Sequence, residues 1–207
     1  MRVQDNQWSS IKDEMIVEGV MYMRIAALLV TLLVVTSAYG REIAGVDVPE
    51  TVSQGDGTQL VLNGAGIRSK MFFKIYIAEL YLAKKQSDAA AILGEDSGRR
   101  IVMHFLYKEV GQDDLVEAWN DGFQGNGTAE QLTELSAQIA TFNTLFDTVK
   151  KGDQIVLDYT VGEGTTVIIR GEKKGTIEGK PFNDLLLSIW LGKAPVGKDL
   201  RDDLLGI

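Results

Sequence analysis

The chain has 207 residues, a formal net charge of -8, no cysteine and a single histidine. Its length suits one domain once a targeting segment is removed, and its composition is that of a globular protein. The acidic balance argues against nucleic-acid binding, which needs clustered lysine and arginine, and the cysteine and histidine counts exclude disulfides, thiolate metal sites and multi-histidine metal sites. We therefore expect no metal, no cofactor and no nucleic-acid partner.

A secretory signal peptide is predicted at residues 23–40. Met23 and Arg24 open the segment with one positive charge, an apolar run follows at 25–35, and small residues come before Gly40. The run is much shorter than the roughly 20 apolar residues needed to span a bilayer, so cleavage after Gly40 is favoured over anchoring. We expect secretion across the inner membrane, a periplasmic location and no stable membrane anchor after cleavage.

Residues 1–22 do not fit a signal peptide. They form an acidic, polar stretch ahead of the positive segment, whereas signal peptides begin with the positive segment itself. The hypothesis is that residues 1–22 are a non-native extension and that translation starts at Met23. The predicted organisation is then an extension at 1–22, a signal peptide at 23–40 and one domain at 41–207.

The first half of this domain has strand-like patterns. Two glycines within 63–66 imply a positive φ or a close backbone approach, and the β-forming segment 71–82 is apolar on both faces, which is typical of a central strand. The pattern predicts, in chain order, an edge strand and turn within 41–58, strands at 59–62 and 71–82, a short helix at 89–93 and a strand at 100–107.

The second half mixes helices and strands. Thr128 and Gln131 match a capping box, and apolar residues recur every three or four positions from Leu132 to Val149, so one long helix is expected there, ending at Lys150-Lys151-Gly152. The other predictions are a helix at 112–123, a three-stranded meander at 153–160, 165–170 and 176–178, a helix from Pro181 to Gly192 and a last helix holding Leu200 to Leu205. This order indicates an α+β fold with helices on a mostly antiparallel sheet.

Over residues 41–207 the chain resembles the chalcone-isomerase-like proteins, specifically their exported bacterial branch. The resemblance implies the chalcone-isomerase-like fold, a mostly antiparallel sheet with helices packed on one face and a ligand cleft between them. Its motifs are 63–68 running into 72–82, 150–159 with 162–165, Ile189-Trp-Leu-Gly192 with Pro195, and Leu204-Leu-Gly206.

The resemblance also implies candidate site residues. Arg68 matches the arginine with which plant isomerases of the family stabilise an anionic substrate, and it would be the catalytic residue if the protein is an enzyme. Fatty-acid-binding members use the equivalent arginine with a tyrosine on the next strand, which makes Tyr76 a candidate ligand contact. Tyr76 stands where the isomerases have threonine, and aligning Asn120 with their helix asparagine places Asp113 where they have tyrosine. The candidate ligand-binding residues are thus Arg68, Tyr76, Asn120 and Asp113.

Three functions stay open, in order of preference. The first is a noncatalytic binder of a small apolar carboxylate such as a fatty acid, because Arg68 is one fixed cation beside a strand that is apolar on both faces. The second is an isomerase, an intramolecular lyase, acting on a chalcone-like enone. The third is an envelope interaction protein with a vestigial cleft. The expected partner is a small lipophilic ligand, and the sequence identifies no protein partner.

The start site can be tested by N-terminal sequencing. Precursor trapped before cleavage should begin at Met23, and mature protein should begin at Arg41. Precursor that begins at Met1 would contradict the proposed start.

Overall fold

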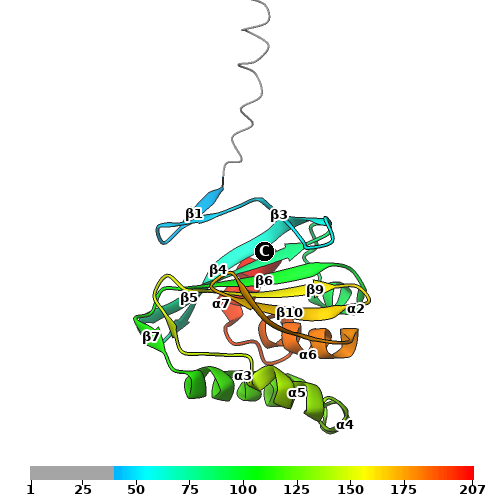
Figure 1. Ribbon diagram of the computed structural model, residues 1–207. Coiled ribbons are helices and arrows are strands. Elements are labelled where there is room, and N and C mark those ends of the chain that lie inside the picture. Colours follow the sequence, from blue (N-terminus) through cyan, green and yellow to red (C-terminus); the bar gives the residue numbers. More distant parts are fainter. Residues whose placement is uncertain (1–39) are drawn as a thin grey trace, which may run out of the picture. The chain divides into compact units, whose positions relative to one another are not determined.

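The computed structural model describes residues 40–207, so the predictions for 1–22 and for most of 23–40 lie outside the described residues. The main element is a seven-stranded sheet in the order β11-β10-β9-β6-β5-β4-β3 (Figure 1), and every neighbouring pair is antiparallel. Its strands are β3 (Thr51–Ser53), β4 (Gln59–Lys70), β5 (Phe73–Leu82), β6 (Arg99–Phe105), β9 (Gln154–Thr160), β10 (Gly164–Ile169) and β11 (Glu172–Ile177). The central strand is confirmed from Phe73 to Leu82, and the meander is confirmed as three consecutive antiparallel strands. Its third strand begins at Glu172, where a turn was predicted, because the chain turns at 170–171 instead.

Two short antiparallel pairs accompany the main sheet. The strands β1 (Arg41–Ile43) and β2 (Val46–Val48) form a hairpin in the segment for which an edge strand was predicted. The strands β7 (Glu109–Val110) and β8 (Val149–Lys150) pair with each other although almost forty residues separate them. This second pair fixes the chain on both sides of the helices between them.

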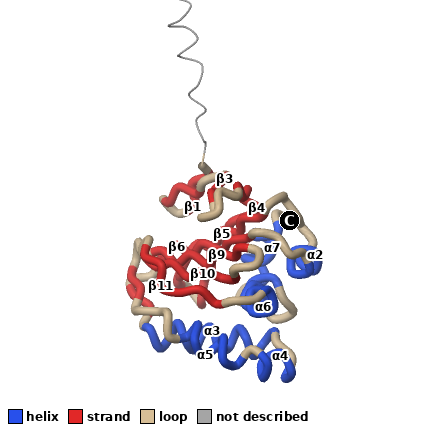
Figure 2. The backbone as a smooth tube through the Cα atoms, turned by 45° about the vertical axis from the view of Figure 1, so that its right-hand side comes forward, coloured by secondary structure: helices blue, strands red, loops and turns tan. Residues whose placement is uncertain are grey.

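The helices cover one face of the sheet, as predicted (Figure 2). Buried side chains from all of them except α4 belong to one hydrophobic core with the inward residues of the strands, while Val48 and strand residues on the opposite face form a smaller cluster. None of the helices within 40–207 is long and apolar enough to cross a membrane. The helices are α2 (Ala89–Gly94), α3 (Gln112–Asn126), α4 (Ala129–Glu134), α5 (Ser136–Asn143), α6 (Lys180–Leu191) and α7 (Lys198–Leu205).

The strand β5 is buried on both faces along most of its length. Alternate residues of a strand point to opposite faces, and Tyr76 and Leu80 enter the core under the helices, whereas Tyr81 enters the smaller cluster on the other side. The expectation fails at the start of the segment, because Phe72 and Phe73 are exposed. The hairpin between β4 and β5 extends beyond the core, so no layer covers these two side chains.

The glycines of 63–66 allow a close approach between β4 and α7. Both lie inside the uninterrupted strand β4, so the prediction that this segment ends a strand at 62 is wrong. A Cβ at Gly64 would overlap the Asp203 carbonyl oxygen and lie 2.6 Å from that of Leu204, and a Cβ at Gly66 would lie 2.6 Å from the Asp203 Cβ. Close packing against a helix, rather than a positive φ, therefore explains these two glycines.

The long helix predicted from Thr128 to Lys151 is wrong. The capping box is present at Thr128, but the segment forms α4, then α5 after a break at Leu135, and finally β8. Serine and threonine hydroxyls compete with helical hydrogen bonding there: Ser136 Oγ donates to the Thr133 carbonyl at 2.8 Å and Thr144 Oγ1 to the Thr141 carbonyl at 2.7 Å. Most of the apolar side chains still reach the core, but they belong to two short helices, a loop and a strand instead of one long helix.

Replacing Gly64 with alanine should destabilise the fold. The added methyl group would force α7 away from β4, and overpacking of this kind costs about 1–3 kcal/mol. Urea unfolding gives this difference in free energy. Gly55→Ala is the matched control, since a Cβ there meets nothing within 4 Å and its stability should hold; equal stability of both variants would contradict the close approach.

Candidate ligand-binding site

A cavity lies between the beginning of α3, the strands β5 and β6, and the end of α6. Its volume is about 90 Å³, and its wall is mostly apolar. Polar groups in the wall belong to Tyr76, Asp114 and Trp119. The lining residues are Ile75, Tyr76, Met103, Phe105, Val110, Asp114, Leu115, Ala118, Trp119, Ile189 and Val196.

Tyr76 is part of this wall, and its hydroxyl has one hydrogen-bond partner within the described part of the chain. It is 8% exposed, and its hydroxyl oxygen accepts a hydrogen bond from Trp190 Nε1 at 3.3 Å. Because that bond uses the oxygen as acceptor, the hydroxyl proton remains available for a second partner. Burial raises the pKa of Tyr76 to about 12, against smaller lowering effects of the Trp190 hydrogen bond and the Arg68 charge. A tyrosine is protonated at physiological pH even at its ordinary pKa, so the hydroxyl keeps a proton that it can donate.

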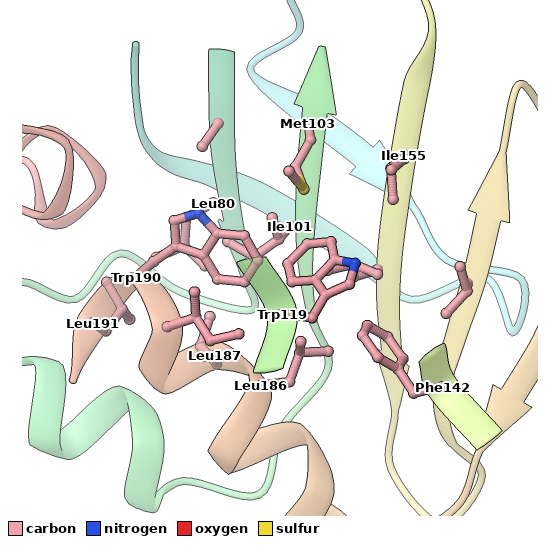
Figure 3. Packing of buried hydrophobic residues seen from close by; sticks show 14 of the residues in the cluster. Leu80, Ile101, Met103, Trp119, Phe142, Ile155, Leu186, Leu187, Trp190 and Leu191 are labelled. Carbon is pink, nitrogen blue, oxygen red and sulfur yellow. The ribbon is translucent and has the colours of Figure 1, made fainter. Parts of the chain in front are cut away.

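Trp119 contributes a second donor. Its side chain is 4% exposed and lines the cavity, and its Nε1 is buried with no hydrogen-bond partner among residues 40–207. Figure 3 shows the Trp119 and Trp190 indoles in the layer between the sheet and α6, and their ring centroids are 5.9 Å apart. An unpaired buried donor costs about 1–3 kcal/mol, so an acceptor that entered and reached this N–H would stabilise the site.

Arg68 lies at the edge of the cavity rather than in its wall. Arg68 and Tyr76 are opposite each other in the β4–β5 ladder, so their side chains lie on the same face of the sheet. The half-buried guanidinium donates from Nη1 to the Ser69 carbonyl oxygen, and Nη1 lies 4.0 Å from where a Cβ on Gly197 would be. Gly197 follows Val196, which lines the cavity.

The two candidates on α3 lie apart from this cavity wall. Asn120 is half-buried, and its Oδ1 accepts a hydrogen bond from Asn143 Nδ2 at 2.9 Å, so that oxygen already has a structural partner. Asp113 is exposed in the first turn of α3. It is the next residue, Asp114, that reaches the cavity. The structure thus groups Arg68 with Tyr76 and leaves Asn120 and Asp113 outside the group.

The arrangement suits recognition of an apolar molecule that carries a hydrogen-bond acceptor. Apolar side chains supply most of the contact surface, Tyr76 and Trp119 supply neutral donors, and Arg68 supplies a positive charge nearby. Residues 40–207 contain no group of three acidic or histidine side chains that could hold a metal ion.

Sequence reasoning missed Trp119 and Asp114 as parts of the site. The helical spacing of Trp119 marks it as a core residue, and nothing in a sequence shows that a core indole lacks an acceptor. The position of the cavity depends on how α3 and α6 settle on β5 and β6, which no local pattern encodes.

One solved structure with a similar fold is that of a fatty-acid binding protein from Arabidopsis thaliana. The alignment has a TM-score of 0.55 and 17% sequence identity, and it covers 75% of this chain and 96% of the plant chain. At this identity the likeness concerns the fold alone. A search of curated protein sequences found no match.

A family model matches a larger part of the chain than this plant structure does. The model of the family described as chalcone isomerase-like matches residues 40–206, nearly all of the part described by the structure. It spans the antiparallel sheet, the helices on its inner face and the cavity between them. The chain belongs to the chalcone isomerase-like family.

Proposed function

We propose that the protein is a noncatalytic binder of a small apolar carboxylate such as a fatty acid. The observation that carries this proposal is an apolar cavity lined by Tyr76, with Arg68 opposite Tyr76 in the β4–β5 ladder and on the same face of the sheet. A similar fold in a protein described as fatty-acid binding supports the same ligand class. Family membership by itself is compatible with either binding or isomerisation.

The head group would lie near Tyr76 and Arg68. A carboxylate that leaves water needs charge-assisted hydrogen bonds to offset its lost hydration, and a guanidinium provides them as a planar pair of donors. The Tyr76 proton supplies a further donor at the same place. The carboxylate of Asp114 would repel a second negative charge, which favours the Arg68 side of the cavity for the head group.

The tail would occupy the apolar part of the cavity. At about 90 Å³ the cavity is smaller than the roughly 150 Å³ cavity that takes up benzene in another protein. It therefore holds a short apolar segment, and a longer chain would extend past the exposed Ala118 or require α3 to shift. Each methylene that is buried contributes about 0.8 kcal/mol, or about fourfold in affinity, and this gain should cease once the available apolar surface is covered.

We also propose that the mature protein acts outside the cytoplasm. This part rests on the sequence of residues 23–40, in which one positive charge, a short apolar run and small residues follow one another. A periplasmic binder would meet apolar acids released from the cell envelope.

Arg68→Ala should weaken binding of laurate by about ten- to a hundredfold, because a hydrogen bond to a charged group contributes about 1.5–3 kcal/mol. Isothermal titration calorimetry with laurate measures the change, and native mass spectrometry after lipid extraction identifies what the purified protein carries. Arg41→Ala is the matched control, since it removes an exposed arginine from β1. If Arg68→Ala binds laurate and palmitate as tightly as the unmodified protein, the assignment fails.

Tyr76→Phe should lower both affinity and stability. The variant removes the donor to the carboxylate and also leaves the buried Trp190 N–H without its acceptor, at a cost of about 1–3 kcal/mol in the free energy of unfolding. Calorimetry and urea unfolding measure the two effects. Tyr107→Phe serves as the control because Tyr107 is exposed; unchanged laurate affinity in Tyr76→Phe would remove Tyr76 from the site.

A further inference from the structure

The tip of the β4–β5 hairpin is an exposed apolar cluster, here called the hairpin tip and made of Met71, Phe72, Phe73 and Tyr107. Phe72 is 93% exposed, Met71 84% and Phe73 55%. The Phe73 and Tyr107 rings pack edge to face with centroids 5.5 Å apart, so the exposed surface is continuous. The other large exposed hydrophobic residues within 40–207, Val161 and Ile207, lie singly.

Folding alone does not explain the residues at this turn. Lys70 pairs with Phe73 and only Met71 and Phe72 connect the strands, a connection that normally favours glycine, asparagine or aspartate. Met71 has a φ of 56°, a conformation that costs energy for a residue with a side chain. Large apolar residues at such a position, exposed to water, indicate that something outside the chain contacts them.

Lysines lie beside the hairpin tip. Lys70 and Lys74 flank it on the two strands, Lys108 follows Tyr107, and the Lys151 backbone N–H donates to the Lys108 carbonyl at 3.2 Å, which places 150–151 beside this region. The segments 68–74, 106–110 and 149–152 contain six basic residues and a single carboxylate, that of Glu109. Glu109 pairs with Lys150 at 3.6 Å. Basic residues thus predominate beside an apolar tip on a protein of net charge -8.

An apolar tip with lysines beside it on neighbouring strands fits the surface of an anionic bilayer. Lysines are attracted to the negative headgroups, and aromatic and methionine side chains enter the boundary between headgroups and acyl chains. A protein partner that covered the tip would instead have to present an acidic rim around an apolar pocket.

The hairpin tip also lies next to the cavity. From Phe73 the strand β5 leads directly to Ile75 and Tyr76, which line the cavity, and the backbone N–H groups of Leu106 and Tyr107 both donate to the Ile75 carbonyl. A bilayer in contact with the tip would therefore be close to the cavity.

We propose that the hairpin tip docks reversibly on membranes that contain anionic lipid, with Met71 and Phe72 inserted among the headgroups. Docking does not depend on the ligand. Only its consequence, a short path for an apolar acid between bilayer and cavity, rests on the proposed function.

A single fluorescent label tests this proposal in the full chain. The chain has no cysteine, so Met71→Cys carries an environment-sensitive nitrobenzoxadiazole group at one position and keeps both phenylalanines. Val161→Cys, in the β9–β10 turn at the opposite end of the sheet, is the matched control. Vesicles of phosphatidylcholine and phosphatidylglycerol, with no added fatty acid, should increase emission from the Met71 position several-fold and shift it to the blue, while emission from the Val161 position stays constant.

Charge variants show whether the lysines beside the hairpin tip cause the fluorescence response to anionic vesicles. Lys70→Glu combined with Lys74→Glu, in the labelled Met71→Cys chain, should weaken the response by about tenfold or more, and molar salt should also weaken it. Lys84→Glu with Lys85→Glu changes the net charge equally at the far end of β5 and should leave the response intact. The Lys70→Glu and Lys74→Glu variant should still bind laurate in solution. A loss of membrane docking can therefore be told apart from a failure of the proposed function.

Three results would overturn the docking proposal. The first is no change at the Met71 position with anionic vesicles. The second is an equal change at both labelled positions, which shows adsorption without a preferred face. The third is a change at the Met71 position that depends on protein concentration and needs no vesicles, which shows that the tip contacts another copy of the protein.

Discussion

The hydrogen bond from Trp190 to Tyr76 joins helix α6 to the central strand at the edge of the cavity. Both side chains are buried, so neither can exchange this bond for one to water without opening the core. The bond fixes how far α6 stands from the sheet, keeps the Tyr76 oxygen as an acceptor and leaves its proton available for another group. The orientation of the Tyr76 hydroxyl, and with it the polarity of the proposed site, depends on this contact, while burial of the apolar cluster around it holds the core together.

The cavity combines an apolar wall with few polar groups, and this limits the ligands it suits. Tyr76 presents a protonated, buried hydroxyl, and Trp119 presents an N–H without an acceptor among the described residues. Arg68 adds a permanent charge at the edge, where its half-buried side chain keeps access to water. A molecule with an acidic group at one end and a short apolar body could bind the Tyr76 hydroxyl, the Trp119 N–H and the Arg68 charge together. A strongly polar solute would instead lose its hydration without compensation.

The sequence predicted the fold better than the site. A β-forming run that is apolar on both faces suffices for β5, and alternation suffices for β9 because side chains on a strand have a period of two. The Thr128 capping box is a local signal that holds in the structure. The prediction of one long helix was wrong because serine and threonine hydroxyls bond to backbone carbonyls there and because Val149 pairs with Val110 in a strand, although the apolar spacing is helical. Arg68 and Tyr76 came from the family resemblance, whereas no sequence pattern shows that the buried Trp119 N–H has no acceptor among residues 40–207.

Entry of an apolar carboxylate into the cavity beside Tyr76 would change the surroundings of two buried indoles. The most direct measurement is a ¹⁵N–¹H correlation spectrum of the indole groups during titration with laurate, in a chain that has three tryptophans. If the carboxylate enters this cavity, the Trp119 and Trp190 indole resonances, assigned through Trp119→Phe and Trp190→Phe, should shift together and saturate. If neither resonance moves at a laurate concentration that saturates binding, the ligand lies elsewhere and the account is contradicted.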